Sequence, residues 1–300
     1  MDRIEAMATL LAAVDGGSLS AASRKLGMPL ATVSRKVSEL EAHLGIRLVN
    51  RSTRQLTLTD AGRSYIAGCK RILEDIEEIE RAAAGEYTAP RGDLVITAPI
   101  VFGRLHVLPV VAEFLSAYPE IDIRLALGDR VVNLHEDAVD VAVRIGALPD
   151  SSLITTRVGA IRQVVCGSPK YFAEKNMPQQ PDDLRQHDIV TFDNLTSPQS
   201  WKFAVNGAIQ SIALHSRLVV NTAEAAIDAA TMSVGVTQVL SYQTASGVNA
   251  GTLVLALEKF EPEPWPVSLV YAGQGLLPIK TRAFLDFIAP RLKARLAQRP

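Results

Sequence analysis

The stretch from Thr59 to about Ala84 constrains the fold most, because it carries a heptad pattern. Its apolar side chains recur at alternating spacings of four and three residues, with acidic side chains outside them. The six positions are Tyr65, Cys69, Ile72, Ile76, Ile79 and Ala83. Such a seam predicts a long helix that pairs with a second copy, although a surface helix packed on its own domain fits the same pattern. We therefore expect a homodimer, with separate folded parts before and after this helix.

The residues before this helix predict three shorter helices. Apolar spacings of three and four residues place them at 3–14, 21–26 and 31–44. Ser18 or Ser20 is suited to cap the second helix, and Gly27 to end it. Two helices joined by a short turn form a helix-turn-helix, which we place at about residues 18–37.

A basic hairpin follows the third helix. Residues 47–51 and 55–58 alternate as two short strands would, which predicts a wing. Residues 1–58 carry eight Lys and Arg against five acids, although the whole chain has a net charge of -1. Small hydroxyls beside an arginine on the third helix suit the major groove of double-stranded DNA. A solvated basic face is the alternative, and the order of the elements argues against it. The candidate DNA-binding residues are Leu30, Ala31, Thr32, Ser34, Arg35, Ser38, Arg51, Thr53 and Arg54.

After Gly92 the pattern changes to short Val-rich and Ile-rich runs between helical segments. This alternation predicts a mainly parallel sheet with helices on both faces. We expect strands at 94–98, 121–127, 139–145, 163–166, 189–192, 217–220, 234–237, 253–257 and 267–271, and helices at 102–117, 131–136, 169–175, 222–233 and 279–296. A hairpin is expected at 201–214, around Asn206-Gly207. So many strands predict two α/β lobes, with 262–266 as one crossover between them.

The chain resembles the LysR-type transcriptional regulators along essentially its whole length. The residues that carry the resemblance are 18–27 (SLSAASRKLG), 32–41 (TVSRKVSELE), 44–48 (LGIRL), 50–54 (NRSTR) and 58–62 (LTDAG). Two departures are Leu19, where phenylalanine is usual, and Pro29-Leu30-Ala31, which lacks a glutamine found in many members. Leu30 and Ala31 remain suited to touch thymine methyl groups.

The resemblance implies an α+β two-domain fold. A winged helix-turn-helix is expected at residues 1–59, a linker and dimerisation helix with its hinge at 60–87, and a two-lobed, periplasmic-binding-protein-like α/β domain at 88–300. Lobe I would comprise about 92–161 and 267–300, and lobe II about 162–266. It also implies a sequence-specific transcriptional regulator that assembles into dimers and homotetramers and contacts RNA polymerase.

The resemblance further implies that the cleft between the lobes binds a small-molecule effector. The expected contacts lie at strand ends and helix starts, where backbone N–H groups are open. They are Ala98, Pro99, Ile100, Val101, Asp129, Arg144, Ile145, Gly146, Asn221 and Thr222. Pro99 stands where members that bind acids often carry a hydroxyl, which argues against an acidic effector. Pro99 is equally suited merely to start a helix, and Asn221 merely to cap one.

Other functional classes fit the sequence less well. Nucleotide-binding, nucleophile-elbow and zinc-protease motifs are absent, so we expect no enzyme. Cys69 and Cys166 share no metal-ligand spacing and the five histidines show none, so no metal site is expected. No cofactor is expected either. No apolar run approaches the roughly 20 residues that span a bilayer, and the start of the chain is charged, so a cytoplasmic location without membrane association is expected. A C-terminal domain that only oligomerises and binds no ligand remains an alternative.

Overall fold

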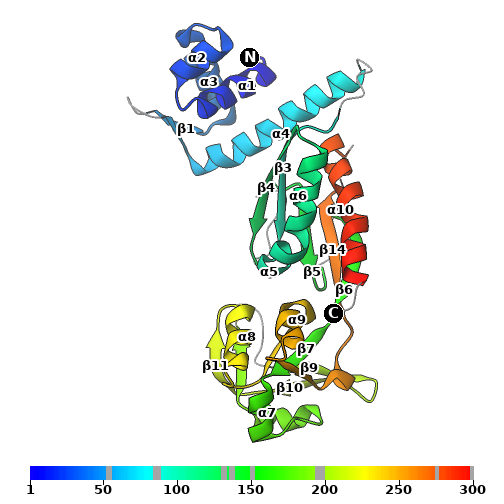
Figure 1. Ribbon diagram of the computed structural model, residues 1–300. Coiled ribbons are helices and arrows are strands. Elements are labelled where there is room, and N and C mark those ends of the chain that lie inside the picture. The colour runs from blue at the N-terminus through cyan, green and yellow to red at the C-terminus, as the bar shows by residue number, and fades with distance from the viewer. Residues whose placement is uncertain are drawn as a thin grey trace.

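The computed structural model describes residues 1–51, 56–83, 89–129, 134, 139–148, 153–192, 200–273 and 277–297, with the side chains of all of these except 51, 71, 75, 78 and 81–83. Three units follow one another from the N-terminus: a small helical unit, a long helix, and two α/β lobes (Figure 1).

The N-terminal unit has the expected winged helix-turn-helix. It comprises α1 (Arg3–Asp15), α2 (Leu19–Leu26), α3 (Leu30–Leu44), β1 (Val49–Arg51) and β2 (Leu56–Leu58), and the two strands pair antiparallel. Its core contains Leu10 of α1, Val37 and Leu40 of α3, and Leu48 beside the wing. All three helices start and end within two residues of the positions expected from the sequence.

The long helix α4 (Asp60–Ala83) has 24 residues and is therefore about 36 Å long. Its first turns pack on the N-terminal unit through Tyr65 and Ile66. Farther along, two ion pairs join α4 to the first lobe, Lys70 with Asp93 and Glu74 with Lys280. The helix thus contacts both domains.

The first lobe is built on a five-stranded sheet in the order β4-β3-β5-β14-β6. The strands are β3 (Gly92–Ala98), β4 (Ile121–Leu127), β5 (Val141–Ile145), β6 (Leu153–Ile161) and β14 (Trp265–Ala272). The helical elements are α5 (Ile100–Phe102), the π-helical turn η1 (Gly103–Val107), α6 (Leu108–Ala117) and α10 (Ile279–Ala297). Phe102, Phe114 and Phe284 are fully buried between the helices and the sheet.

The second lobe contains three small sheets, ordered β12-β7-β13, β11-β8 and β10-β9. Its strands are β7 (Gln163–Gly167), β8 (Ile189–Phe192), β9 (Ser200–Val205), β10 (Ala208–Ala213), β11 (Ser216–Val220), β12 (Thr237–Leu240) and β13 (Val254–Ala256). Its helices are α7 (Pro169–Lys175), η2 (Pro181–Gln186), α8 (Ala223–Thr231), α9 (Ser241–Asn249) and η3 (Glu258–Phe260). The β9–β10 hairpin turns at Asn206-Gly207, as expected.

Several strand predictions were wrong. The five-stranded sheet is mixed and not mainly parallel, because β14 returns from the second lobe and runs antiparallel to both β5 and β6. In the second lobe, the β12-β7-β13 sheet is antiparallel throughout. The strand expected at 234–237 is instead β12, three residues later, and Val236 forms only an isolated bridge to Ile189. Strand β6 and helix α9 were not expected. The helix expected at 131–136 lies outside the described residues, except for Leu134.

Within the described part of the chain, one helical stretch, Ile100–Ala117, is long and apolar enough to cross a membrane by length and composition alone. Its Phe102, Val110 and Phe114 are buried in the core of the first lobe. Core packing therefore explains its apolar character.

Candidate DNA interface and effector site

Local hydrogen bonds fix the turn between α2 and α3. The Ser18 hydroxyl accepts a hydrogen bond from Ala21 N at 3.1 Å and caps α2, and Gly27 ends the helix with a positive φ of 63°. The Ser23 hydroxyl then donates to Met28 O at 2.5 Å. These bonds hold α3 at a defined angle to α2.

Helix α3 has one buried and one exposed face. Val33, Val37 and Leu40 are buried. The expected DNA-binding residues lie on the other side: Leu30, Ala31, Arg35 and Ser38 are exposed, and Thr32 and Ser34 are half-buried. The Arg35 Nη1 atom lies 2.9 Å from Glu39 Oε1, one turn along the helix.

The wing is less completely described. Arg51 lies in β1, where it pairs with Leu56, but its side chain is not described. Thr53 and Arg54 lie outside the described residues. Their expected role in binding DNA therefore stays a prediction.

Two residues not singled out from the sequence attach the wing to the helices. The Glu41 carboxylate on α3 accepts hydrogen bonds from Leu48 N at 2.8 Å and Val49 N at 3.1 Å. The Thr59 hydroxyl caps α4 by accepting from Gly62 N at 2.9 Å. A Cβ atom on Gly62 would lie 2.0 Å from Leu48 O, so only glycine allows α4 to approach the wing this closely.

The expected dimer seam on α4 divides into two parts. Tyr65 packs against the core of the N-terminal unit and Cys69 is only 1% exposed, so these side chains are covered by their own chain. Burial raises the pKa of Tyr65 to about 12. Ile72 is 46% exposed and Ile79 is 64% exposed, whereas Ile76 is half-buried. The side chain of Ala83 is not described. An apolar strip that the chain leaves partly uncovered therefore starts at Ile72 and continues through Ile76 and Ile79; we call it the open strip.

Most of the expected effector residues at the end of β3 make contacts within the protein. Ala98 and Val101 are buried in the core, and Pro99 directly precedes α5. Ile100 is 40% exposed, and its N–H donates to Asp129 Oδ1 at 3.2 Å. A carboxylate of the protein thus already accepts the hydrogen bond at this helix start.

The three candidate effector residues after β5 differ from one another in their contacts. Arg144 is half-buried, its Nη2 atom has no hydrogen-bond partner among the described residues, and burial lowers its pKa. Ile145 packs against the core of the first lobe. Gly146 has a φ of 105° and donates its N–H to Pro266 O at 2.9 Å, beside the crossover between the lobes.

In the second lobe, Thr222 and not Asn221 caps α8. The Thr222 hydroxyl accepts from Ala225 N at 3.2 Å, and Asn221 is exposed. The structure thus leaves the Asn221 side chain at the surface and gives Thr222 a local structural role.

An aromatic contact between the lobes was not expected from the sequence. Tyr242 of α9 lies edge-on to Phe102 at 5.5 Å and to His106 at 5.6 Å between ring centroids. Burial first, and then the carboxylates of Asp129 and Glu224, raise the pKa of Tyr242. Tyr242 therefore brings the second lobe against the residues that surround the expected effector site.

The two crossovers between the lobes are joined by an ion pair. Arg162 lies between β6 and β7, and its Nη1 atom is 3.1 Å from both carboxylate oxygens of Glu261, which precedes β14. Burial raises the pKa of Glu261, and Arg162 partly opposes this shift. Among the residues that the structure describes, no cluster of His, Cys, Asp or Glu side chains is arranged to hold a metal ion.

Comparisons with known proteins agree with this geometry. Residues 4–63 match the family model described as bacterial regulatory helix-turn-helix protein, lysR family, and residues 88–293 match the LysR substrate binding domain. The chain belongs to the LysR family. It is a transcriptional regulator with a helix-turn-helix DNA-binding domain and an effector-binding domain.

Named relatives cover nearly the whole chain. An HTH-type transcriptional repressor of Pseudomonas aeruginosa is 33% identical over 96% of this chain and 92% of its own length. The HTH-type transcriptional activator AaeR of Escherichia coli is 30% identical over 95% of this chain and 93% of its own length. The structure of CrgA, a LysR-type transcriptional regulator from Neisseria meningitidis, has a TM-score of 0.62 and 28% identity and covers 96% of this chain and 98% of that one. Repressors and activators thus both occur among the relatives of this chain.

Proposed function

We propose that this LysR-family chain is a cytoplasmic regulator that reads an operator with the exposed face of α3 and the wing. The proposed boundaries are residues 1–59 for DNA binding, 60–87 for the linker, and 88–300 for effector binding. Linker helices pair from Ile72 onward, dimers assemble into tetramers, and the DNA-bound assembly contacts RNA polymerase. The chain carries out no catalytic step.

The exposed face of α3 supports DNA reading most directly. The buried side chains of α3 pack on α1, α2 and the wing, so the face that carries Ala31, Arg35 and Ser38 points to solvent. A guanidinium in the major groove binds guanine O6 and N7 through two parallel hydrogen bonds. Arg35 leaves its exposed ion pair with Glu39 at small cost, since such pairs contribute about 0.3–0.5 kcal/mol.

Replacing Arg35 tests this role. Arg35→Ala should weaken binding to the specific site by about 1–3 kcal/mol if it reads a base. Glu39→Gln should strengthen binding, because it removes both the competing partner and a negative charge near the phosphates. Arg124→Ala, an exposed arginine in β4 of the first lobe, is the control for loss of charge. Equal weakening on specific and unrelated DNA would instead make Arg35 a phosphate contact, and no change would exclude Arg35 from the DNA contact.

The effector proposed for the cleft carries a hydrogen-bond donor or a positive charge. Asp129 lies at the start of α5 and close enough to Tyr242 to raise its pKa. Glu224 of the second lobe also raises the pKa of Tyr242, so carboxylates from both lobes lie within electrostatic range of this ring. An acidic effector would meet repulsion there, whereas a cationic or hydroxyl-bearing molecule would not.

Thermal unfolding of the full chain with panels of amines, polyols and acids tests the effector class. A ligand at 100 times its dissociation constant should stabilise the folded chain by about 2.7 kcal/mol. Asp129→Asn should remove the shift produced by a cationic ligand. If no compound shifts the unfolding of the chain, the alternative of a domain that only oligomerises is favoured.

A further inference from the structure

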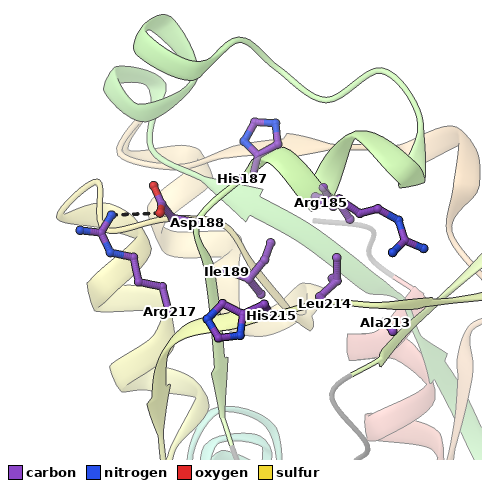
Figure 2. Close-up of a pocket in the computed structure, with 9 residues that line it drawn as sticks. Arg185, His187, Asp188, Ile189, Ala213, Leu214, His215 and Arg217 are labelled. Atoms are coloured by element: carbon purple, nitrogen blue, oxygen red, sulfur yellow. Dashed lines mark ion pairs between the residues drawn. The ribbon is translucent and has the colours of Figure 1, made fainter.

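A pocket of about 400 Å³ lies in the second lobe, separate from the cleft residues described above (Figure 2). It forms where η2 and the first residues of β8 and β11 meet the end of β10. Its volume is within the range of small-molecule sites, roughly 300–1,000 Å³. The parallel strands β8 and β11 both start at this pocket, and β11 ends just before Asn221 and Thr222.

The floor of the pocket is apolar. Ile189 is 1% exposed and Leu214 is 6% exposed, and both belong to the core of this lobe. In Figure 2 their side chains point to the same side, toward the space between Asp188 and Arg185. The floor is therefore suited to contact the hydrocarbon part of a ligand.

A β-bulge places Arg217 at the rim. The register of the parallel pair shifts between Ser216 and Leu218, so Arg217 is the extra residue in β11. A bulge redirects a side chain, and bulges are common beside binding sites. Here the Arg217 Nη1 atom lies 2.9 Å from Asp188 Oδ1, and the Arg217 side chain is still 66% exposed.

The backbone of Asp188 is held from two sides. Its N–H donates to the Tyr171 hydroxyl at 2.8 Å, and its carbonyl accepts from Val236 N at 2.9 Å. A Cβ atom on Gly235 would lie 2.1 Å from Asp188 O, so the neighbouring chain packs directly on this residue. Asp188 therefore orients Arg217 from a rigid position, as a preorganised site requires.

The chemistry of the rim selects an anion. The Arg217 guanidinium carries five N–H donors in a planar fork that matches a carboxylate. Asp188 pairs with the Nη1 atom of this fork. Asp188 is the one carboxylate among the lining residues, and Arg217 pairs with it. Arg185 also lines the pocket, but its Nε atom pairs with Asp182 Oδ1 at 3.3 Å, so it takes no part in this arrangement. We propose that this pocket binds a small organic carboxylate, with its oxygens on Arg217 and its hydrocarbon part on Ile189 and Leu214. This second site accepts the acidic ligands that Asp129 repels from the cleft.

Methyl NMR of the full chain tests the site directly, with isovalerate, phenylacetate and inorganic phosphate as probes. Isovalerate and phenylacetate should produce saturable shifts of the Ile189 and Leu214 methyl signals. Arg217→Met should weaken this binding about tenfold or more, because a hydrogen bond to a charged group is lost. Asp188→Asn should tighten it, because the competing carboxylate is removed.

Arg185→Met is the matched control, because the Arg185 guanidinium points away from the Asp188–Arg217 pair in Figure 2. It removes the same charge from the same rim and should change the affinity by less than about twofold. Unchanged methyl signals elsewhere in the spectrum would show that each variant is folded. Absence of shifts with both carboxylates, equal binding of phosphate, or unchanged binding by Arg217→Met would each overturn the proposal.

Discussion

Replacing Ile72 and Ile79 with aspartate should dissociate the pair of linker helices. The two side chains are 46% and 64% exposed in one chain, although both are large and apolar. Full burial of an isoleucine side chain stabilises by about 1.5–3 kcal/mol. Covering the exposed parts of both side chains therefore contributes about 2–3 kcal/mol for each protomer and about 4–6 kcal/mol for a dimer.

The double variant loses this contribution and introduces like charges into the seam. Because each 1.4 kcal/mol changes an equilibrium constant about tenfold, the dissociation constant of the pair should rise by about 1,000-fold or more. Sedimentation velocity of the full chain over a range of concentrations should then show an assembly of lower mass than that of the wild-type protein. Far-UV circular dichroism should remain unchanged, since both positions are at the surface.

Ile46→Asp is the matched control for this experiment. Ile46 is also 46% exposed, but it follows α3 and lies outside the linker helix. It should sediment as the wild-type protein does. A double variant that keeps the wild-type mass at every concentration would refute the assignment of the open strip to the dimer interface.

Three further predictions concern stability. Gly62→Ala should destabilise the chain by about 1–3 kcal/mol through overpacking against the wing. Gly68→Ala, on the same helix but with open space at its Cβ position, should stabilise the chain by about 0.5–1 kcal/mol. Thermal unfolding measures both effects. Ser18→Ala should cost about 1 kcal/mol by removing the cap of α2, and Ser20→Ala should have little effect, so equal losses would contradict the cap assignment. Burial lowers the pKa of His106, so the unfolded chain binds the proton more readily and stability should fall as pH drops through and below the ordinary histidine range. His106→Gln should flatten that pH dependence. An unchanged profile of stability against pH would contradict the role given to His106.

The N-terminal unit could be predicted closely because its signals are local. Ser18 at a helix start, Gly27 at a helix end, and the buried spacing of Val33, Val37 and Leu40 each act within a few residues. The resemblance to the LysR family added the order of the domains and the expected cleft. Such signals depend little on what the rest of the chain does.

The strand pairing of the second part depended on contacts distant in sequence. β12 is displaced because Val236 first bonds to Asp188, which lies 48 residues earlier, and only then does the chain pair with β7. The direction of β14 was likewise set by its return from the second lobe. Alternation of apolar residues shows that a strand exists but not which neighbour it pairs with.

The candidate effector residues stay a prediction, and the structure adds contacts that the sequence did not indicate. Asp129 was expected to face a ligand; in the structure its Oδ1 atom accepts a hydrogen bond from Ile100 N at the start of α5. Tyr242 was missed because α9 has no strong periodic pattern and its partners lie on the other lobe. The seam residue Cys69 has the right spacing, but only the packing of α4 on the N-terminal unit shows that it is covered.

Selection of sites from a randomised duplex library by the full chain tests the central claim most directly. The account predicts enrichment of an inverted repeat whose half-sites are separated by one helical turn, or a multiple of it, about 34–36 Å per turn. Arg35→Ala should bind the selected site more weakly while its binding to unrelated DNA changes less. An unenriched pool, or the same motif bound equally well by Arg35→Ala, would contradict the claim that α3 reads an operator through Arg35.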